Sequence, residues 1–443
     1  MMCRNSEQGV KSSASERVRM PSRALRVALV GLSGFAKVHY QMIQRAVACD
    51  RICLLGATVI NQEDELEKCE CIRAAGGDIF DDYEKMFRAL NGQLDLCFIP
   101  TGIHLHARMA IAAMEAGANV FLEKPAAATI QDVRAIQATE RKTGRFVAVG
   151  FQTIYASETL WMKQAILDGR IGKIRSIRSM GLWPRDDAYY ARNDWAGRLL
   201  VGQDWMLDSP FNNAIGHQLN MMCFLGGITV EKSAELAGIR AELYRAHSIE
   251  SADTACMRIE TTTGLPLYFY ATHSSSTQVD PEIIIDGELG SIHWTFTEVA
   301  LSTDQGEETI LACQFGDELR EVIIERLLAR SVDDSVFICD LEIAAAHTIC
   351  VNGAHESSEV HNIPPDFIQR LADESGSVKT VVVGLDQSLT QAFQQGKLLS
   401  EIGVKWAVPG QYIDLSDYSY FPRFRQFECW EGSKTEPEIE VVR

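Results

Sequence analysis

From Leu25 to about residue 150, short apolar runs rich in β-branched residues alternate with longer amphipathic stretches. Runs of this length predict buried strands, and the stretches between them carry apolar residues at helical spacing. The predicted strands are 26–31, 54–60, 94–100, 119–123 and 145–151, and the helices between them include 103–116 and 130–142. Repeated βαβ units form a doubly wound parallel sheet, so the first part of the chain is predicted to be an α/β domain.

The pattern changes after about residue 172, where segments of alternating polar and apolar residues follow one another with few helices between them. Adjacent strands without a helical crossover pair antiparallel. The second part is therefore predicted to be an α+β domain with a large, mostly antiparallel open sheet and helices at one side. Its predicted strands are 173–180, 253–262, 265–273 and 281–287, and a late helix is predicted over 385–402.

This change of pattern divides the chain into four parts. Residues 1–23 mix Ser, Arg, Lys and Glu and are predicted to form a disordered tail, the parallel-sheet domain covers 24–150, the α+β domain covers 151–420, and an acidic tail covers 421–443. The apolar run LPLYFYATH at 265–273 predicts an exposed apolar face on the second sheet. An uncovered face of this kind is a liability for an isolated chain.

Charge and composition exclude several kinds of partner. The 443 residues carry 60 acidic and 42 basic side chains, for a net charge of -18, and an acidic surface repels nucleic acid and anionic membranes. No apolar run reaches the roughly 18 residues needed to cross a bilayer, and no secretory signal is expected. The 12 cysteines are scattered without the paired spacing of a zinc site. They predict a reducing, cytoplasmic setting and no metal.

The first predicted strand runs into a glycine-containing turn that opens a helix. Backbone N–H groups in such a turn hold a pyrophosphate, so the sequence predicts a dinucleotide site here. Ser33 stands where a glycine normally lets the backbone approach phosphate, and the next residue is a glycine. Two interpretations are open: the serine donates its hydroxyl to phosphate, or the turn no longer binds a nucleotide. The candidate residues are Gly31, Ser33, Gly34, Phe35 and Ala36.

Asn61 follows the second predicted strand, where an acid usually binds the adenosine ribose and selects NAD. An amide can bond a ribose hydroxyl but does not repel a 2′-phosphate. NAD and NADP therefore both remain candidates, and NAD is favoured because no arginine follows directly.

Glu123, Lys124 and Pro125 lie at the end of the fifth predicted strand, the edge where doubly wound sheets bind ligands. Beside a nicotinamide cation a lysine is driven toward its neutral form, which suits it to exchange a proton with a substrate hydroxyl. Glu123 is predicted to hold that amine and to accept a bond from a ribose hydroxyl. The alternative is a surface lysine in front of a proline that starts a helix.

Four segments, taken in order, resemble one known family. They are the turn at 31–36, the stretch IPTGIHLH at 99–106, the segment AGANVFLEKPAA at 116–127 and the strand ending VGFQ at 149–152. Together they resemble the nucleotide-binding domain of the Gfo/Idh/MocA oxidoreductases, in which a Rossmann domain precedes a mostly antiparallel sheet domain. The resemblance covers about residues 24–300. It implies a homodimer or homotetramer formed through the second sheet.

The resemblance also implies roles around the cofactor. Lys124 would lie beside nicotinamide and substrate, and the Lys124-Pro125 peptide would be cis to aim it. Gly102 stands where the family usually has proline, so its loop is expected to be more flexible. His104 and His106 have an alternative role as capping residues at a helix start. The resemblance implies that four further residues contact the cofactor: Thr101, Gly102, His106 and Gln152.

Asn213 and His217 lie four residues apart in a helix predicted to open at Asp208, so both are expected on one helical face. An imidazole is a natural acceptor of the proton released when an alcohol is oxidised. The resemblance implies an aspartate where Asn213 stands and a histidine that shares proton transfer with the lysine. Asp208 is the candidate to supply the negative charge that Asn213 lacks. The alternative for His217 is a packed histidine at the domain junction.

The segment 181–210 is dense in Trp, Tyr, Arg, Asn and Asp. Aromatic faces pack on sugar C–H groups while charged and amide groups bond the hydroxyls, so a sugar or polyol site is predicted here. No more than half of these side chains are expected to contact ligand, because a long loop also needs anchors. The candidates in this segment are Trp183, Arg185, Tyr189, Arg192, Asn193, Trp195, Arg198 and Asp208, with Asn213 and His217 following it.

Together these features predict an NAD(P)-dependent oxidoreductase acting on a secondary alcohol of a sugar, inositol or related polyol, with Lys124 and His217 handling the proton. One alternative is an enzyme that oxidises a sugar transiently and cleaves its glycosidic bond by elimination. Another is a non-catalytic, cofactor-sensing regulatory protein. The departures at Ser33, Asn61 and Asn213 favour the sensor, whereas the retained lysine and histidine favour an enzyme.

Overall fold

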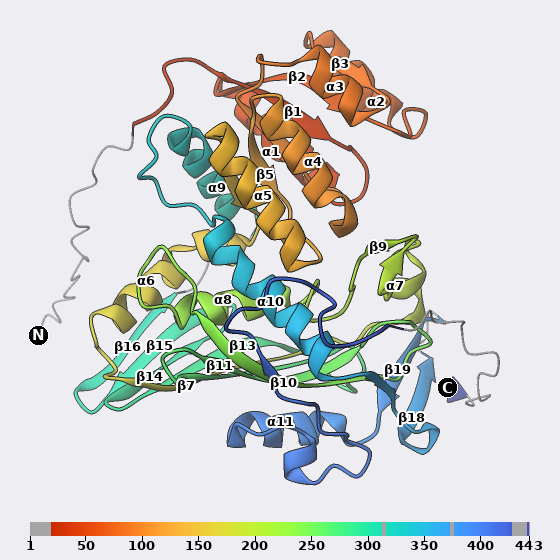
Figure 1. Ribbon diagram of the computed structural model, residues 1–443, viewed down its shortest axis with the longest axis vertical. Helices are drawn as coiled ribbons and strands as arrows, with labels where there is room; N and C mark the ends of the chain where they lie inside the picture. Colours follow the sequence, from red (N-terminus) through yellow and green to blue (C-terminus); the bar gives the residue numbers. More distant parts are fainter. Residues whose placement is uncertain (1–18, 312–315, 373–375, 428–440, 443) are drawn as a thin grey trace, which may run out of the picture.

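The computed structural model describes residues 19–311, 316–372, 376–427 and 441–442, and places a parallel-sheet domain beside a larger, mostly antiparallel one (Figure 1). The tail predicted to be disordered over 1–23 lies outside the described residues except for 19–23. Of the acidic tail predicted over 421–443, only 421–427 and 441–442 are described.

The first domain is a six-stranded parallel sheet in the order β3-β2-β1-β4-β5-β6. Every residue of β4 and β5 is buried, because helices cover both faces of the sheet. The strand order reverses between β1 and β4, and a ligand crevice forms outside such a switch point. The strands are β1 (Leu25–Val30), β2 (Ile52–Thr58), β3 (Asp78–Phe80), β4 (Leu96–Ile99), β5 (Asn119–Leu122) and β6 (Val147–Val149).

The helices of this domain follow the predicted alternation. The predicted helix 103–116 is divided into a 3-10 turn and a helix that begins at His106. The predicted helix 130–142 begins after Thr129, whose side chain caps it, and ends before Gly144, whose φ of 66° a glycine adopts readily. The helical elements are α1 (Ala36–Ala48), α2 (Leu66–Ala74), α3 (Tyr83–Ala89), η1 (Ile103–Leu105), α4 (His106–Glu115) and α5 (Ile130–Thr143).

The second domain contains a ten-stranded sheet in the order β16-β15-β14-β13-β7-β12-β11-β10-β17, with β20 pairing to β10. Among the described strands of this sheet, only β12 with β7 and β10 with β17 pair in parallel. The strands are β7 (Ile174–Leu182), β10 (Leu236–Arg245), β11 (Thr254–Thr261), β12 (Pro266–Thr272), β13 (Val279–Gly287), β14 (Gly290–Trp294), β15 (Glu298–Thr303), β16 (Gly306–Leu311), β17 (Val360–Asn362) and β20 (Ile413–Asp414). The α/β and α+β organisation predicted from the sequence is confirmed.

More helices accompany this sheet than the sequence pattern predicted. Several lie between the two sheets, and α11 lies on the opposite side of the large sheet (Figure 1). The helical elements are η2 (Gln152–Tyr155), α6 (Ser157–Leu167), α7 (Asp187–Ala191), α8 (Gly216–Leu225), α9 (Asp317–Arg330), α10 (Leu341–Ser357), η3 (Pro365–Phe367), α11 (Leu385–Gln395) and η4 (Ser400–Ile402). The smaller strands are β8 (Leu200–Val201), β9 (Asp204–Trp205), β18 (Ile368–Ala372), β19 (Val378–Val382) and β21 (Val441–Val442).

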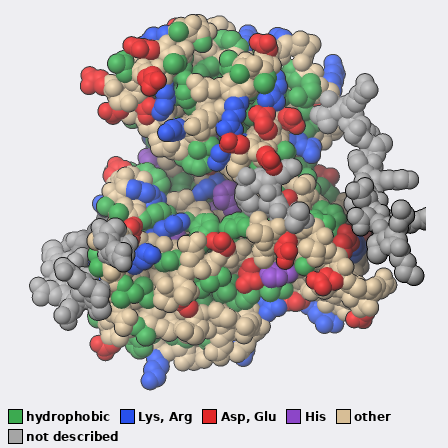
Figure 2. Space-filling model, turned by 180° about the vertical axis from the view of Figure 1, so that it is seen from behind, with side chains coloured by type: hydrophobic (Ala, Val, Ile, Leu, Met, Phe, Trp, Pro, Cys, Tyr) green, Lys and Arg blue, Asp and Glu red, His purple; other side chains and the backbone are tan. Residues whose placement is uncertain are grey.

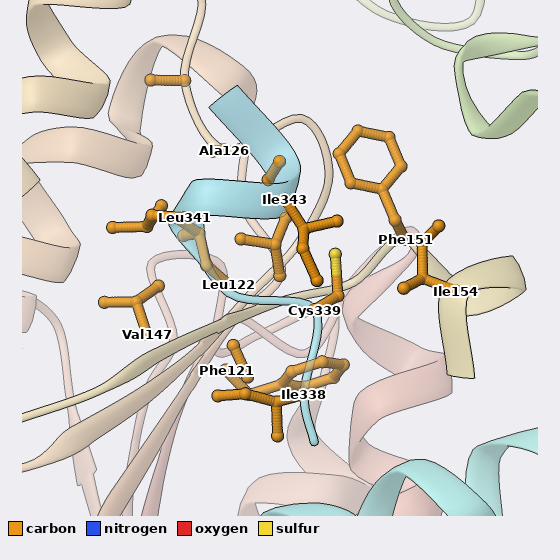
Figure 3. Close-up of a cluster of buried hydrophobic side chains, with 14 of the residues drawn as sticks. Phe121, Leu122, Ala126, Val147, Phe151, Ile154, Ile338, Cys339, Leu341 and Ile343 are labelled. Atoms are coloured by element: carbon orange, nitrogen blue, oxygen red, sulfur yellow. The ribbon is translucent and has the colours of Figure 1, made fainter. Parts of the chain in front are cut away.

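The two domains share one buried core. The Val149 backbone N–H donates to the Cys339 carbonyl oxygen at 2.7 Å, which joins the end of β6 to the segment before α10. Figure 3 shows side chains from both domains packed together there: Phe121, Leu122, Ala126, Val147, Phe151 and Ile154 with Ile338, Cys339, Leu341 and Ile343. Helix α9 also packs on α1 of the first domain. The late part of the chain therefore returns to the N-terminal domain.

Helix α11 covers the face of the large sheet that the sequence predicted to be exposed. Tyr270, in the run LPLYFYATH, is fully buried and its hydroxyl donates to the carbonyl oxygens of Ala392 (3.0 Å) and Lys397 (2.9 Å). Leu389 and Phe393 of α11 complete this apolar cluster. The prediction of an exposed apolar face was wrong, because this chain supplies its own cover.

The predicted late helix 385–402 is shorter than the pattern indicated. It ends at Gln395, because Gly396 adopts a left-handed φ of 59° and turns the chain, and the 3-10 turn η4 follows.

Candidate active site

The turn after β1 has the geometry of an anion-binding turn. Gly31 and Gly34 have φ of 94° and 58°, and the Ala36 Cβ would lie 3.6 Å from a Cβ added at Gly31. Within the described chain, the backbone N–H groups of Ser33, Gly34 and Phe35 donate to no protein acceptor. Three free N–H groups before the N-terminus of α1 fit the pyrophosphate of a dinucleotide.

Large apolar side chains lie exposed around this turn. The exposed fractions of Phe35 and Ile60 are 49% and 87%. Phe35 belongs to the turn itself, and Ile60 follows β2 at the same edge of the sheet. Both offer apolar surface that the rings of a nucleotide would cover.

A polar cluster connects the turn to the end of β2. The Ser33 hydroxyl donates to Glu65 Oε1 at 2.8 Å, and Asn61 Nδ2 donates to Ser33 Oγ at 2.9 Å. Lys68 forms an ion pair with Glu65, and the hydrogen bond from Lys68 lowers the pKa of the Glu65 carboxyl. The Ser33 hydroxyl is thus directed to Glu65 rather than left free for phosphate. The sequence analysis missed Glu65, although its position just before α2 was a usable signal.

Glu123 is held by a histidine that the sequence analysis also missed. His39 Nε2 on α1 lies 2.9 Å from Glu123 Oε1, and the Lys124 backbone N–H donates to Glu123 Oε2 at 3.1 Å. The exposed fractions of His39 and Glu123 are 1% and 6%. Burial is the largest single influence and acts to raise the pKa of Glu123, but the hydrogen bonds from His39 and from the Lys124 N–H, together with nearby positive charge, outweigh it, so the pKa lies below its usual value. The prediction that Glu123 holds the lysine amine was wrong.

Asn213 of the second domain holds that amine instead. Lys124 Nζ donates to Asn213 Oδ1 at 2.8 Å and to the Asn213 carbonyl oxygen at 3.0 Å. Asn213 Nδ2 in turn donates to Asp208 Oδ1 at 2.9 Å, and the Gly197 N–H donates to Asp208 Oδ2 at 2.7 Å. Burial lowers the pKa of Lys124 and raises that of Asp208. The chain Lys124–Asn213–Asp208 is therefore an amine joined to a buried carboxyl through an amide.

The segment after Lys124 is fixed by two helices. The Lys124-Pro125 peptide is cis. His106 Nδ1 lies 2.8 Å from the Pro125 carbonyl oxygen and Nε2 lies 3.1 Å from that of Thr101. From α10, Thr348 Oγ1 donates to the Ala127 carbonyl oxygen at 3.2 Å. The His106 side chain is fully buried. It therefore supports the backbone around the lysine and has no surface to offer a cofactor, contrary to the prediction.

Asn352 of α10 completes this support. Its Oδ1 accepts from the Ile130 N–H at 2.9 Å and its Nδ2 donates to the Ala128 carbonyl oxygen at 2.8 Å. The sequence offered no signal for Asn352, because it lies within a buried helix. The other predicted loop residues, Thr101, Gly102 and Gln152, are half-buried after β4 and β6.

His217 lies in the first turn of α8, which begins at Gly216. Asn213 therefore belongs to the preceding turn, and the prediction that both residues share a helical face was wrong. The His217 ring packs edge-on against Phe151 at 5.8 Å, and its Nδ1 has no hydrogen-bond partner among the described residues. Burial, and after it the Lys124 charge, lowers the pKa of His217 to about 3. The imidazole is neutral at physiological pH.

The loop between β7 and α8, which carries the predicted substrate residues, contacts the first domain. Trp195 packs with Ile103 and Met206, which ties this loop to the first domain beside the loop after β4. Asn193 is an anchor rather than a free amide, because its Oδ1 accepts from the N–H of Trp195 (3.2 Å) and of Ala196 (2.8 Å). Figure 2 shows a furrow between the upper and lower parts of the molecule with basic and histidine side chains on its walls.

Two further properties concern the described residues only. No cluster of three or more His, Cys, Asp or Glu side chains is arranged to hold a metal ion among them. No helix in the described ranges combines the length and apolar character that a membrane crossing needs.

Comparison with known proteins relates this geometry to named families. Residues 25–151 match the model of the oxidoreductase family with an NAD-binding Rossmann fold, and residues 159–293 match the Gfo/Idh/MocA C-terminal domain. An inositol 2-dehydrogenase of Klebsiella pneumoniae is 27% identical over 207 residues, which are 46% of this chain and 54% of that protein. A D-glucoside 3-dehydrogenase of Escherichia coli is 27% identical over 169 residues, 37% and 46% of the two chains. The chain thus spans about half the length of the curated relatives it matches.

Among solved structures, an inositol dehydrogenase homolog from Azotobacter vinelandii complexed with NAD+ has a TM-score of 0.64 and 15% identity. The match covers 76% of this chain and 96% of that one, so the fold is shared and about a quarter of this chain lies outside the match. With both domain models matched in order over most of the described core, the chain belongs to the Gfo/Idh/MocA oxidoreductase family.

Proposed function

We propose that this protein is an NAD-dependent dehydrogenase that oxidises a secondary alcohol of a sugar, inositol or related polyol, or reduces the corresponding ketone. The observation that carries the proposal is the position of Lys124. Its amine lies at the carboxyl edge of the parallel sheet and is held from the second domain by Asn213. The relatives named as inositol and glucoside dehydrogenases support the substrate class.

A bound nicotinamide dinucleotide supplies the hydride acceptor. The chain's own part is placement of the alcohol and management of its proton. Burial lowers the pKa of Lys124, which makes the neutral amine accessible for taking the proton from the substrate hydroxyl. His217, neutral at physiological pH, is proposed to hydrogen-bond the same hydroxyl rather than to act as the principal base. Asn213 and Asp208 are proposed to orient the lysine.

Glu65 supports NAD over NADP. Its carboxylate is held at the end of β2 by Ser33 and Lys68, at the edge where the adenosine half of a dinucleotide binds. A fixed negative charge repels the 2′-phosphate of NADP. Lys68 neutralises part of that charge, so discrimination is expected to be moderate. We also propose a cytoplasmic setting, because the nine cysteines found free are spread over both domains.

The test is a dehydrogenase assay with matched lysine variants. Inositols, sugars and sugar acids are screened with NAD, and reduced nicotinamide is followed by absorbance. Lys124→Met should lower kcat at least about a hundredfold, since positioned proton transfer contributes that much or more. Lys173→Met, at an exposed position before β7, is the matched control and should keep the wild-type rate.

Nucleotide binding is measured separately by quenching of tryptophan fluorescence. Tight NAD binding without turnover on any compound would contradict the proposal and support the cofactor-sensing alternative. Full activity in Lys124→Met would contradict the role of the lysine.

A further inference from the structure

Five side chains of the loop after β7 form an alternating stack of aromatic rings and guanidinium groups. The Arg185 Cζ lies 5.6 Å from the centre of the Trp183 ring and 4.8 Å from that of Tyr189. On the other side, the Arg192 Cζ lies 3.7 Å from the Tyr189 ring and 5.1 Å from that of Trp195. The central carbon of each guanidinium therefore lies over two aromatic rings. The N–H groups of a guanidinium lie in its plane and point outward along its edges.

Neither guanidinium has an acidic partner in the described part of the chain. Arg185 makes no side-chain hydrogen bond there, and its Nε is buried without an acceptor. Arg192 donates to the Tyr189 carbonyl oxygen at 2.5 Å and, among the described residues, to no carboxylate. A buried donor without an acceptor is costly, as at Arg185 Nε, whereas Arg192 is exposed and its guanidinium is accessible to a ligand.

Four acids near this stack are engaged by other groups, each as a hydrogen-bond acceptor or in an ion pair, and a fifth, Asp194, is exposed to solvent. Asp186 caps α7 and accepts from Ser377, Asp187 pairs with Arg370, Asp208 accepts from Gly197 and Asn213, and Asp280 accepts from the Trp183 indole. The stack thus keeps a local positive charge in a chain whose net charge is -18.

The stack also begins close to the reactive lysine. Burial is the main cause of the lowered pKa of Lys124, and the Arg192 charge adds to it. The same charge counteracts the effect of burial on the pKa of Asp208. The hydrogen bond of 2.7 Å from the Gly197 N–H to Asp208 fixes the end of this loop beside Lys124, Asn213 and Asp208. A molecule bound at Lys124 and extending along the loop would therefore reach the arginines of the stack.

We propose that the edges of Arg192 and Arg185 bind an anionic group, a carboxylate or a phosphate, carried by the sugar or polyol that reacts at Lys124. This inference rests on the proposed function and narrows its substrate class. Guanidinium edges match the two oxygens of a carboxylate or phosphate in a bidentate fork. A neutral polyol would leave both forks without their natural acceptor.

The test compares matched sugars on the full-length protein with NAD. D-Glucose, D-glucuronate and glucose 6-phosphate differ at one carbon only, and the two anions distinguish a carboxylate from a phosphate. We expect at least one anion to have a kcat/KM about tenfold or more above that of glucose. Binding of the same sugars to the protein–NADH complex is measured by calorimetry, which does not require turnover.

The variants separate charge from shape. Arg192→Met and Arg185→Met should raise the KM or dissociation constant of the preferred anion about 10- to 100-fold, as expected for loss of charge-assisted hydrogen bonds. Arg192→Lys keeps the charge but loses the fork, so it should fall between Arg192→Met and the wild type. Arg175→Met, at an exposed position of β7, is the control and should change neither constant.

The results of these experiments distinguish the proposed anionic substrate from the proposed dehydrogenase activity. Turnover of neutral polyols that equals or exceeds that of their anionic counterparts, with no effect of Arg192→Met, would overturn the anionic substrate and leave the dehydrogenase. Arginine-dependent binding of an anionic sugar without turnover would support the stack as an anion site and overturn the dehydrogenase.

Discussion

Replacing Asp208 with asparagine tests whether its charge acts on Lys124 through Asn213. One amide side chain separates the amine from the carboxyl, by hydrogen bonds of 2.8 Å and 2.9 Å at its two ends. The two charges therefore lie about 7 Å apart, and at an effective dielectric constant of about 20 they attract each other by about 2 kcal/mol. Removing the carboxylate destabilises the ammonium form and lowers the pKa of the lysine.

The assay is the pH dependence of kcat/KM for alcohol oxidation. The neutral amine accepts the proton, so activity rises with pH through the pKa of Lys124. In Asp208→Asn the midpoint of that rise should move to lower pH by about 1.5 pH units. Asn213→Asp places a negative charge directly on the amine and should move the midpoint in the opposite direction. Asp194→Asn, at an exposed position of the same loop, should leave it unchanged.

An unchanged midpoint in Asp208→Asn would refute this reasoning and reduce Asp208 to an anchor for Gly197. A midpoint that moved upward would refute its sign. Thermal unfolding of each variant distinguishes a shifted pKa from a damaged fold, because the midpoint of a pH profile does not depend on the amount of folded enzyme.

Three further outcomes follow from the structure. Glu65→Gln removes the carboxylate beside Ser33 and should lower the preference for NAD over NADP about tenfold, measured as the ratio of the two kcat/KM values; an unchanged ratio would exclude Glu65 from cofactor choice. His39→Ala leaves Glu123 buried without its partner and should cost about 3 kcal/mol in the free energy of unfolding, measured with urea, whereas His39→Gln can still donate and should lose less. Leu389→Ala removes a fully buried side chain of α11 and should cost about 2–5 kcal/mol. The same variant should elute from a size-exclusion column at a larger apparent size, because α11 loosens from the sheet and exposes apolar surface. Unchanged stability and an unchanged elution volume would contradict the role of α11 as a cover.

The sequence predicted the parallel sheet well because its strands are buried on both faces and appear as uninterrupted apolar runs, as in β4 and β5. It also placed Lys124 at the correct edge, since the position of a residue at a strand end is a local property. The contacts of that lysine are not local. Asn213 is 89 residues away and its amide looked like a loss of function, whereas it bridges the amine to Asp208.

The errors have a common physical origin. Glu123 and His39 are 84 residues apart, and nothing in either segment indicates their pairing. The run LPLYFYATH is apolar on both faces because α11 covers the second one, but a strand pattern alone cannot distinguish a cover from the same chain from a second copy. The loop at 181–210 contained the right residue types for an arginine–aromatic stack. Its alternating order follows from the folded path of the loop and not from sequence spacing.

Helix α10 has a consequence for motion. It packs on α5 and β6 of the first domain and on α8 and β10 of the second. Its residues Thr348 and Asn352 hydrogen-bond the backbone after Lys124. Rotation of one domain about the other would have to break the packing of this helix in both domains. The segment between β7 and α8 is joined to the first domain by fewer contacts: the apolar cluster around Ile103, the ion pair of Arg108 with Asp204, and the hydrogen bonds from Lys124 to Asn213. We expect small molecules to reach Lys124 by release of these contacts rather than by rotation of the domains.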